Sequence, residues 1–204
     1  MVEANAVPNF LPSTNGFRFA NRYPSGPTVR LGPIDPRIVG IGDASSGLCG
    51  GMSWYVRERF VAGLPVPQDT EAPANGSPLF KTIVHRQVLS LDWLRTPLRI
   101  WWMGALGPDR ALDRTRMVEW PHIRAEIDAG RLAMLGLVRH TGWNPFKLTN
   151  NHQVLAYAYE IDGDAVTIKL CDPNWPAQDD VLVHLGTNLS QTTGEPLFGV
   201  LRLT

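Results

Sequence analysis

Residues 47–54 read Gly-Leu-Cys-Gly-Gly-Met-Ser-Trp, and this stretch places one of the two cysteines of the chain where a helix is about to begin. Met52, Val56 and Phe60 follow at intervals of four, the spacing of a buried helix face. Cys49 therefore falls in the first turn of the predicted helix. Unpaired backbone N–H groups and the positive end of the helix dipole favour a thiolate there. The neighbouring glycines leave room for another backbone to come close.

A histidine and an acid lie on two predicted strands further along the chain. His152 opens the run at residues 151–159, and residues 166–170 form a second run that leads into Asp172. The Asp-Gly-Asp turn between the runs suits a β-hairpin. Alternation along the second strand puts Asp172 on its apolar face and Cys171 on the opposite face. A lone buried cysteine is usually inert, but a cysteine, a histidine and an acid in this order are typical of a thiol-nucleophile triad.

At these places the sequence resembles the papain-like cysteine peptidases. It is most similar to bacterial branches that have a Gly-Xaa-Cys-Gly-Gly-Met helix start, an Asn-His-Gln-Val-Leu-Ala-Tyr strand and an Asp-Pro-Asn turn, here at residues 47–52, 151–157 and 172–174. These branches are related to the peptidases that process bacteriocin leaders. The resemblance implies a papain-like α+β fold, in which an N-terminal helical lobe with the nucleophile packs on a C-terminal lobe of antiparallel sheet.

The resemblance also implies an activity, the cysteine-dependent hydrolysis of amide or peptide bonds in a peptide or protein substrate. Cys49 is then the nucleophile, His152 the general base and later the acid, and Asp172 the group that orients His152. Asn174 is the alternative third member, because papain itself uses asparagine, although it follows Pro173 in the turn.

The chain departs from the papain-like pattern at the oxyanion donor. The superfamily usually has a glutamine six residues before the nucleophile, whereas this chain has Asp43, and an ionised carboxylate cannot donate a hydrogen bond. Losing one oxyanion donor typically costs about 10²- to 10³-fold in rate. Candidate substitutes are a protonated Asp43, Ser45, Ser46, Asn21 and Gln68. Two alternatives therefore stay open, which are thiol acyl transfer of the transglutaminase type on the same triad and a catalytically inactive papain-like binding domain.

Charge and cysteine content narrow the class of partner. Lys and Arg together number 19, as do Asp and Glu, so net charge gives no reason to expect nucleic acid or an acidic membrane. Two cysteines are too few for a disulfide framework. The one bond they could form, between Cys49 and Cys171, would block the nucleophile. The sequence has no motif with metal-ligand spacing, so we expect no metal and no cofactor.

The N-terminal residues do not resemble a targeting signal. Residues 1–15 carry an acidic residue where a signal peptide has Lys or Arg, and they contain no apolar run of useful length. No stretch approaches the roughly 18 apolar residues of a membrane span. We therefore expect a cytoplasmic protein with no membrane partner.

The 204 residues predict a single domain with helices first and strands later, which indicates an α+β arrangement with an antiparallel sheet. Residues 1–39 form an extended arm rich in Pro and Gly, residues 40–130 the helical lobe and residues 131–204 the β lobe. Ser77 caps the second helix, with Pro78 at its first position. The predicted helices span residues 52–60, 79–94, 110–119 and 121–129, and the predicted strands span residues 132–138, 153–161, 165–170, 181–185 and 198–203.

Other residues that could take part in function are assigned structural roles or are left without an assignment. The substrate cleft would draw its side chains from Trp54, Trp143, Phe146, Trp175 and the N-terminal arm. The apolar run at residues 99–103, with its paired tryptophans, is assigned to packing. Surface or packing roles are also assigned to the remaining histidines, His85, His122, His140 and His184.

Overall fold

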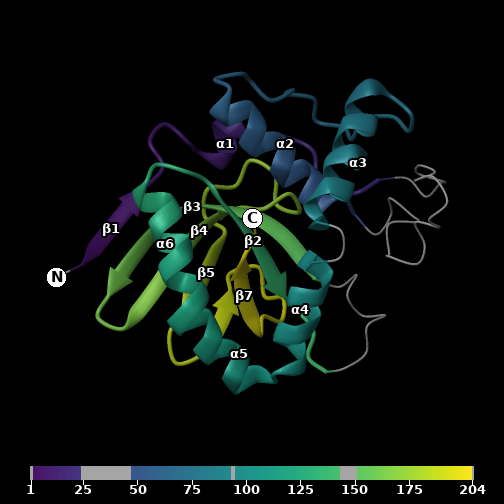
Figure 1. Ribbon diagram of the computed structural model, residues 1–204. Coiled ribbons are helices and arrows are strands. Elements are labelled where there is room, and N and C mark those ends of the chain that lie inside the picture. Colours follow the sequence, from purple (N-terminus) through teal and green to yellow (C-terminus); the bar gives the residue numbers. More distant parts are fainter. Residues whose placement is uncertain (1, 24–46, 93–94, 143–150, 204) are drawn as a thin grey trace.

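The structure, a computed structural model, describes residues 2–23, 47–92, 95–142 and 151–203. Within these residues the fold is mixed α+β, with helices around a curled antiparallel sheet (Figure 1). The α+β class predicted from the order of helices and strands is confirmed. The helices are α1 (Pro12–Asn15), α2 (Cys49–Val61), α3 (Pro78–Ser90), α4 (Arg95–Ala105), α5 (Pro108–Arg114) and α6 (Trp120–Asp128), and the strands are β1 (Glu3–Ala6), β2 (Ala133–Val138), β3 (His152–Asp162), β4 (Ala165–Cys171), β5 (Leu182–Leu185), β6 (Leu189–Gln191) and β7 (Gly199–Arg202).

Strand β3 is the centre of the sheet. The strand order is β6-β5-β4-β3-β2-β7 with antiparallel neighbours, and β1 pairs with the second half of β3. The register sets His152 opposite Leu137 of β2, and Leu155 opposite Cys171 of β4. A bulge in β3 near Ala158 disturbs this pairing and bends the strand. The beginning of β3 and the end of β4 therefore lie side by side at one end of the sheet.

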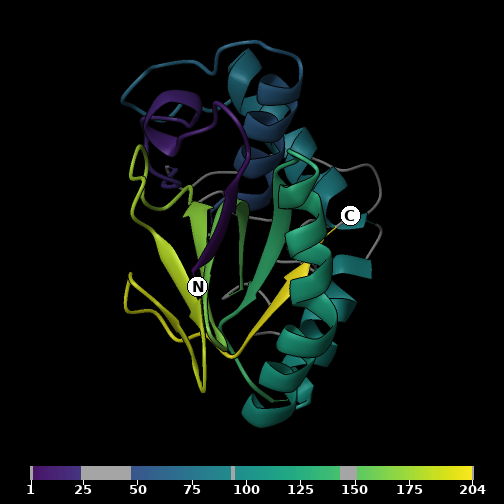
Figure 2. The same cartoon turned by 90° about the vertical axis from the view of Figure 1, so that its left-hand side faces the viewer.

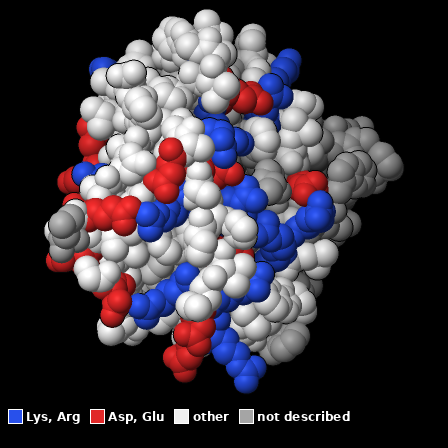
Figure 3. All heavy atoms as spheres, turned by 60° about the vertical axis from the view of Figure 1, so that its left-hand side comes forward, with Lys and Arg blue, Asp and Glu red and all other residues white. Residues whose placement is uncertain are grey.

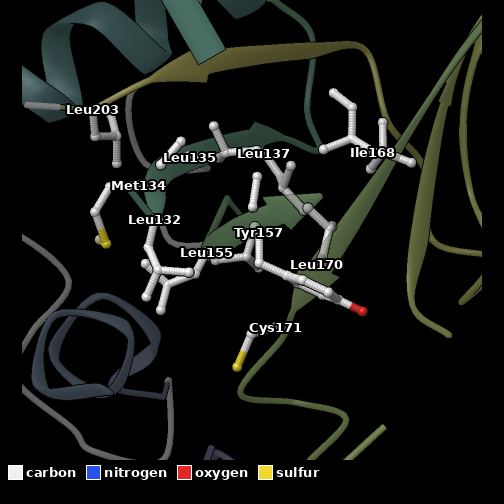
Figure 4. Close-up of a cluster of buried hydrophobic side chains, with 14 of the residues drawn as sticks. Leu132, Met134, Leu135, Leu137, Leu155, Tyr157, Ile168, Leu170, Cys171 and Leu203 are labelled. Carbon is white, nitrogen blue, oxygen red and sulfur yellow. The ribbon is translucent and has the colours of Figure 1, made fainter. Parts of the chain in front are cut away.

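The hydrophobic core lies between the sheet and the helices beside it. Figure 2 shows α5 and α6 running along the sheet, with α2 and α3 across one end. Strand β2 is buried along its whole length, and β3 is buried from His152 to Tyr159. Ile123 and Ile127 of α6 are at most 1% exposed. In Figure 4, leucines of β2, β3 and β4 cluster with Tyr157 and Cys171. Burial on this scale is the main source of stability for a domain of this kind.

Helices α2 and α3 approach each other closely because α2 begins with two glycines. A Cβ atom at Gly51 would lie 2.1 Å from the carbonyl oxygen of Ile83 in α3. A Cβ atom at Gly50 would lie 2.5 Å from Ser90 Oγ and 2.6 Å from Gln153 Oε1. The prediction that these glycines admit another backbone is thus confirmed for Gly51. A bulkier residue would push α2 away from both neighbours.

The start of α3 follows ordinary capping chemistry. Ser77 Oγ accepts the N–H of Phe80 at 3.3 Å, and Pro78 occupies the first turn. Both features agree with the prediction. The helix ends at Ser90 rather than at residue 94 as predicted.

A π-helical segment, Thr115–Glu119, joins α5 to α6 and covers the edge of the sheet. Thr115 Oγ1 accepts the N–H of Val200 at 3.0 Å, and Glu119 Oε2 accepts the N–H of Arg202 at 3.0 Å. Both donors belong to β7, the last strand on this side of the sheet. The two side chains therefore occupy backbone groups that an additional strand could otherwise pair with.

The structure contains strands that the sequence patterns do not predict. Strand β1 lies in the segment predicted as an extended arm, and its four side chains are all exposed, so it has no apolar alternation. It is held instead by backbone pairing with β3 and by Asn5 Nδ2, which donates to Asp128 Oδ1 at 2.9 Å. Strand β6 has only three residues. The apolar run at residues 99–103 belongs to helix α4.

Charged groups join β1, β3 and α6 at the surface. Asp128 Oδ1 also accepts the hydroxyl of Tyr159 at 2.7 Å, and Arg124 pairs with both Asp128 and Glu3. On the face shown in Figure 3, acidic and basic side chains lie next to one another. No helix among the described residues has the length and apolar character needed to cross a membrane.

Candidate active site

Cys49 is the first residue of α2, and neighbouring side chains hold the helix start in place. The N–H of Leu48 donates to Asn21 Oδ1 at 2.6 Å, and the N–H of Gly51 donates to Gln87 Oε1 at 2.9 Å. The residue before Leu48 is Gly47, which has a positive φ of 86° and so favours glycine. The N–H of Gln153 in β3 donates to Cys49 Sγ at 3.4 Å. The thiol therefore lies against the beginning of β3.

His152 begins β3 and lies between the thiol and a carboxylate. It is 4% exposed, and its Nε2 lies 2.6 Å from Asp172 Oδ1. Its ring is also hydrogen-bonded to the thiol of Cys49. Because Nε2 faces Asp172, Nδ1 is the nitrogen left for Cys49. The three predicted residues Cys49, His152 and Asp172 thus form one hydrogen-bonded chain.

Asp172 directly follows β4 and is 2% exposed. Burial of Val166, Ile168 and Leu170 on the same face agrees with the predicted alternation. Besides His152, Asp172 Oδ1 accepts the N–H of Asn174 at 2.8 Å. A buried carboxylate with several donors is favoured in its ionised form.

Asn174, the alternative third member, contributes its backbone rather than its amide to the carboxylate. Its side-chain Oδ1 accepts Asn21 Nδ2 at 3.1 Å. The acid in contact with His152 is therefore Asp172. Asn21 connects three separate parts of the chain, since its other amide atom accepts from Leu48 and its own N–H donates to the carbonyl of Pro173 at 2.9 Å.

The electrostatics of the chain favour a thiolate beside an imidazolium. Desolvation alone would raise the pKa of Cys49, but the charge and hydrogen bond of His152, helped by the N–H of Gln153, lower the pKa below its ordinary value. Burial alone would lower the pKa of His152, but Asp172 and then Cys49 raise it to about 10. Burial opposes ionisation of Asp172, yet His152 and the N–H of Asn174 hold the pKa of this carboxyl below its usual range.

The second cysteine has the opposite surroundings. Cys171 is 8% exposed, and burial, together with the negative charges of Asp172 and Asp179, raises its pKa to about 12. Both cysteines are free thiols. At neutral pH, Cys171 is thus a protonated, inert neighbour of the hydrogen-bonded chain.

The predicted oxyanion candidates are only partly described. Asp43, Ser45 and Ser46 lie outside the described residues. Gln68 Nε2 donates to the carbonyl of Val66 at 2.9 Å, and Asn21 has the bridging contacts given above. A helix N-terminus remains as a source of N–H donors next to Cys49.

The other sequence candidates are scattered. Trp143 and Phe146 lie outside the described residues. Trp54 is half-buried beneath the guanidinium of Arg57, and Trp175 is exposed. The remaining histidines are exposed or half-buried: His85, His122, His140 and His184. Across the described ranges, no group of three or more His, Cys, Asp or Glu side chains is arranged to hold a metal ion.

The sequence patterns do not point to Arg139 or Gln191 as part of the site. Gln191 Nε2 donates to Asp172 Oδ2 at 3.3 Å, and Arg139 Nη2 donates to Gln191 Oε1 at 3.3 Å. Gln191 lies on the short strand β6, which has no recognisable pattern. The one feature that the sequence offers is that Arg139 follows an apolar strand. Many strands end at the surface in this way, so the feature does not indicate a functional role.

Comparisons with models of protein families, with curated proteins and with solved structures found no match for this chain.

Proposed function

We propose that this protein is a cysteine-dependent hydrolase of amide or peptide bonds, with the division of parts found in papain-like enzymes. The nucleophile begins a helix, and the base and acid come from an antiparallel sheet. The observation that carries the proposal is the hydrogen-bonded chain Cys49–His152–Asp172, in which the pKa of the thiol is lowered and that of the imidazole is raised. Nucleophilic catalysis by a thiol needs a pKa that is lowered at the nucleophile and raised at the neighbouring base.

The chemistry begins with the thiolate. Cys49 Sγ attacks the carbonyl carbon of the substrate, and the carbonyl oxygen takes up negative charge. His152 then gives its proton to the departing amine as the C–N bond breaks, which leaves a thioester. In the second half, neutral His152 takes a proton from water, and the resulting hydroxide attacks the thioester. The carboxylic acid leaves, and the thiolate and imidazolium are restored.

Asp172 supports both steps without reacting. Its Oδ1 lies 2.6 Å from Nε2 of His152, so it holds the ring with Nδ1 toward the sulfur and stabilises the positive charge. The backbone N–H groups at the start of α2 that do not donate to Asn21 or Gln87 would supply donors for the oxyanion. They offer stabilisation that does not depend on the usual glutamine.

The test uses thiol labelling and peptide turnover together. A peptide-epoxide probe should label the wild type and C171A equally and leave C49A unlabelled. A mixed peptide library, read by mass spectrometry, should yield new termini with the wild type and none with C49A. If C49A labels as strongly as the wild type, the proposal is wrong. If turnover occurs only after an amine acceptor is added, with an amide as product, the chain is an acyltransferase instead.

A further inference from the structure

Asp172 presents two carboxylate oxygens, and each has its own donors. Oδ1 faces His152 Nε2 and the N–H of Asn174, whereas Oδ2 accepts Gln191 Nε2 at 3.3 Å. Gln191 is 6% exposed, so its amide has little access to water. Donors on both oxygens prevent the carboxylate from turning about its Cβ–Cγ bond. This arrangement keeps Oδ1 pointed at the imidazole.

Gln191 is itself oriented by a cation. Its Oε1 accepts Arg139 Nη2 at 3.3 Å, so the amide nitrogen must face Asp172. The guanidinium is held in turn by Glu195, with Nη1 to Oε1 at 3.1 Å and Nη2 to Oε2 at 2.9 Å. The side chain of Arg139 is only 11% exposed. A bidentate pair with this burial has one preferred geometry.

Arg139 also contacts the chain directly before His152. Its backbone N–H donates to Oδ1 of Asn151, the residue that precedes His152, at 3.0 Å. The positive charge of Arg139 is among the influences that keep Asp172 ionised. Arg139, the residue directly after β2, thus contacts both the residue before the base and the amide that holds the acid.

We propose that Gln191, oriented by Arg139, is a positioning residue that holds the Asp172 carboxylate against His152. The inference rests on the proposed function, since the role has meaning only if the chain of Cys49, His152 and Asp172 reacts. Neither Gln191 nor Arg139 touches the reacting atoms. They act through the acid, and through it on the imidazolium and the thiolate.

The experiment measures how the rate of Cys49 alkylation by iodoacetamide depends on pH. Q191M has a side chain of similar length but removes the donor, so the apparent pKa of the thiol should rise and the rate at pH 6 should fall by about 3- to 10-fold. R139M should also raise the apparent pKa of the thiol. The double variant R139M/Q191M should lower the rate by less than the product of the two single effects, because the two residues act in part along one path. S190A, on the exposed face of the same strand, should match the wild type.

Two results would decide against the inference. If the wild-type thiol has a lowered pKa and Q191M leaves it unchanged, Gln191 has no positioning role although the proposed function stands. If the wild-type Cys49 titrates as an ordinary thiol, the proposed function is overturned together with this inference. Should Q191M not fold, Q191N replaces it. Its shorter amide cannot bridge Arg139 and Asp172 at once, so the pKa must again rise.

Discussion

Cys49 and Cys171 meet opposite electrostatic surroundings within one chain. The pKa of Cys49 is lowered by His152, whereas that of Cys171 is raised by burial and by nearby carboxylates. The sequence separates the two on simple grounds, because Cys49 precedes a helix and Cys171 lies on a strand one position before Asp172, although Cys171 is buried rather than turned away from the core. The sequence does not show which groups surround each sulfur. The register of the sheet and the position of the start of α2 decide which side chains meet.

The first prediction concerns the pH dependence of thiol alkylation. Because its pKa is lowered, Cys49 should react with iodoacetamide at a midpoint below the reference thiol value of about 8.5. Replacing His152 by alanine removes the main cause of the lowering, so in H152A the midpoint should rise. Stopped-flow or mass-spectrometric kinetics of C171A, with and without H152A, measures this directly. An unchanged midpoint in H152A would contradict the assigned contact.

The second prediction concerns the pH range of hydrolysis. Activity should appear as Cys49 deprotonates and disappear as the imidazolium loses its proton, with the alkaline limb near the pKa of about 10 that Asp172 helps to set. In D172N the size of the side chain stays but the negative charge is lost, so the alkaline limb should move to lower pH. The maximal rate should fall by about 10²-fold, the low end of general acid–base contributions. D172A should lose more, because the ring is then free to turn.

At the scale of elements, the helix and strand patterns predicted most of the fold. Apolar spacing and the Ser-Pro cap located α2 and α3, and buried runs located β2, β3, β4, β5 and β7. The strands β1 and β6 escaped prediction because backbone pairing and a few polar side-chain contacts hold them, and neither leaves an apolar alternation in so short a sequence. Gln191 lies on β6, so the failure to predict this strand also hid part of the candidate site.

The third prediction tests the contact between α2 and α3. In G51A, the added methyl group would lie 2.1 Å from the carbonyl oxygen of Ile83, so α2 and α3 must move apart. The free energy of unfolding should fall by about 3 kcal/mol, as for an overpacked core position. Urea unfolding measures the loss. Gly186 has open space around it, so G186A should stay within about 0.5 kcal/mol of the wild type.

The fourth prediction tests the covered edge at β7. Valine has nearly the shape of threonine but cannot accept the N–H of Val200, so T115V leaves a buried donor without its partner. Unfolding free energy should fall by about 1–3 kcal/mol. Hydrogen exchange at Val200 should accelerate. M117A, at an exposed position of the same π-helical segment, should change neither quantity. Equal effects in the two variants would refute the role given to Thr115.

At the scale of the whole molecule, segments far apart in sequence depend on single connecting side chains. Asn21 joins the N-terminal segment to the start of α2 and to the turn after β4, through Leu48, Pro173 and Asn174. The sequence suggested Asn21 only as an oxyanion donor, because nothing in a Pro-rich segment reveals a bridge. Its length and amide chemistry matter only once the three segments are folded together.

The fifth prediction follows from this bridge. N21A removes the acceptor of the Leu48 N–H and the donor to Asn174, so the start of α2 should move relative to the end of β4. We expect peptide turnover to fall by at least about 10-fold, since small misplacements of catalytic groups cost this much or more. N5A breaks the exposed contact between β1 and Asp128, which lies away from the candidate site. It should leave turnover unchanged and lower the melting temperature slightly. Turnover in N21A equal to that in N5A would argue against the bridge.

The buried, protonated thiol of Cys171 has a practical consequence. While the chain stays folded, reagents at neutral pH should modify one sulfur per molecule, and a second modification requires that the sheet come apart. In a C49A variant, Cys171 is the one remaining thiol, so its modification measures how often the sheet opens. Brief pulses of a thiol reagent would then count the transiently unfolded population, without any added dye or fluorescent label.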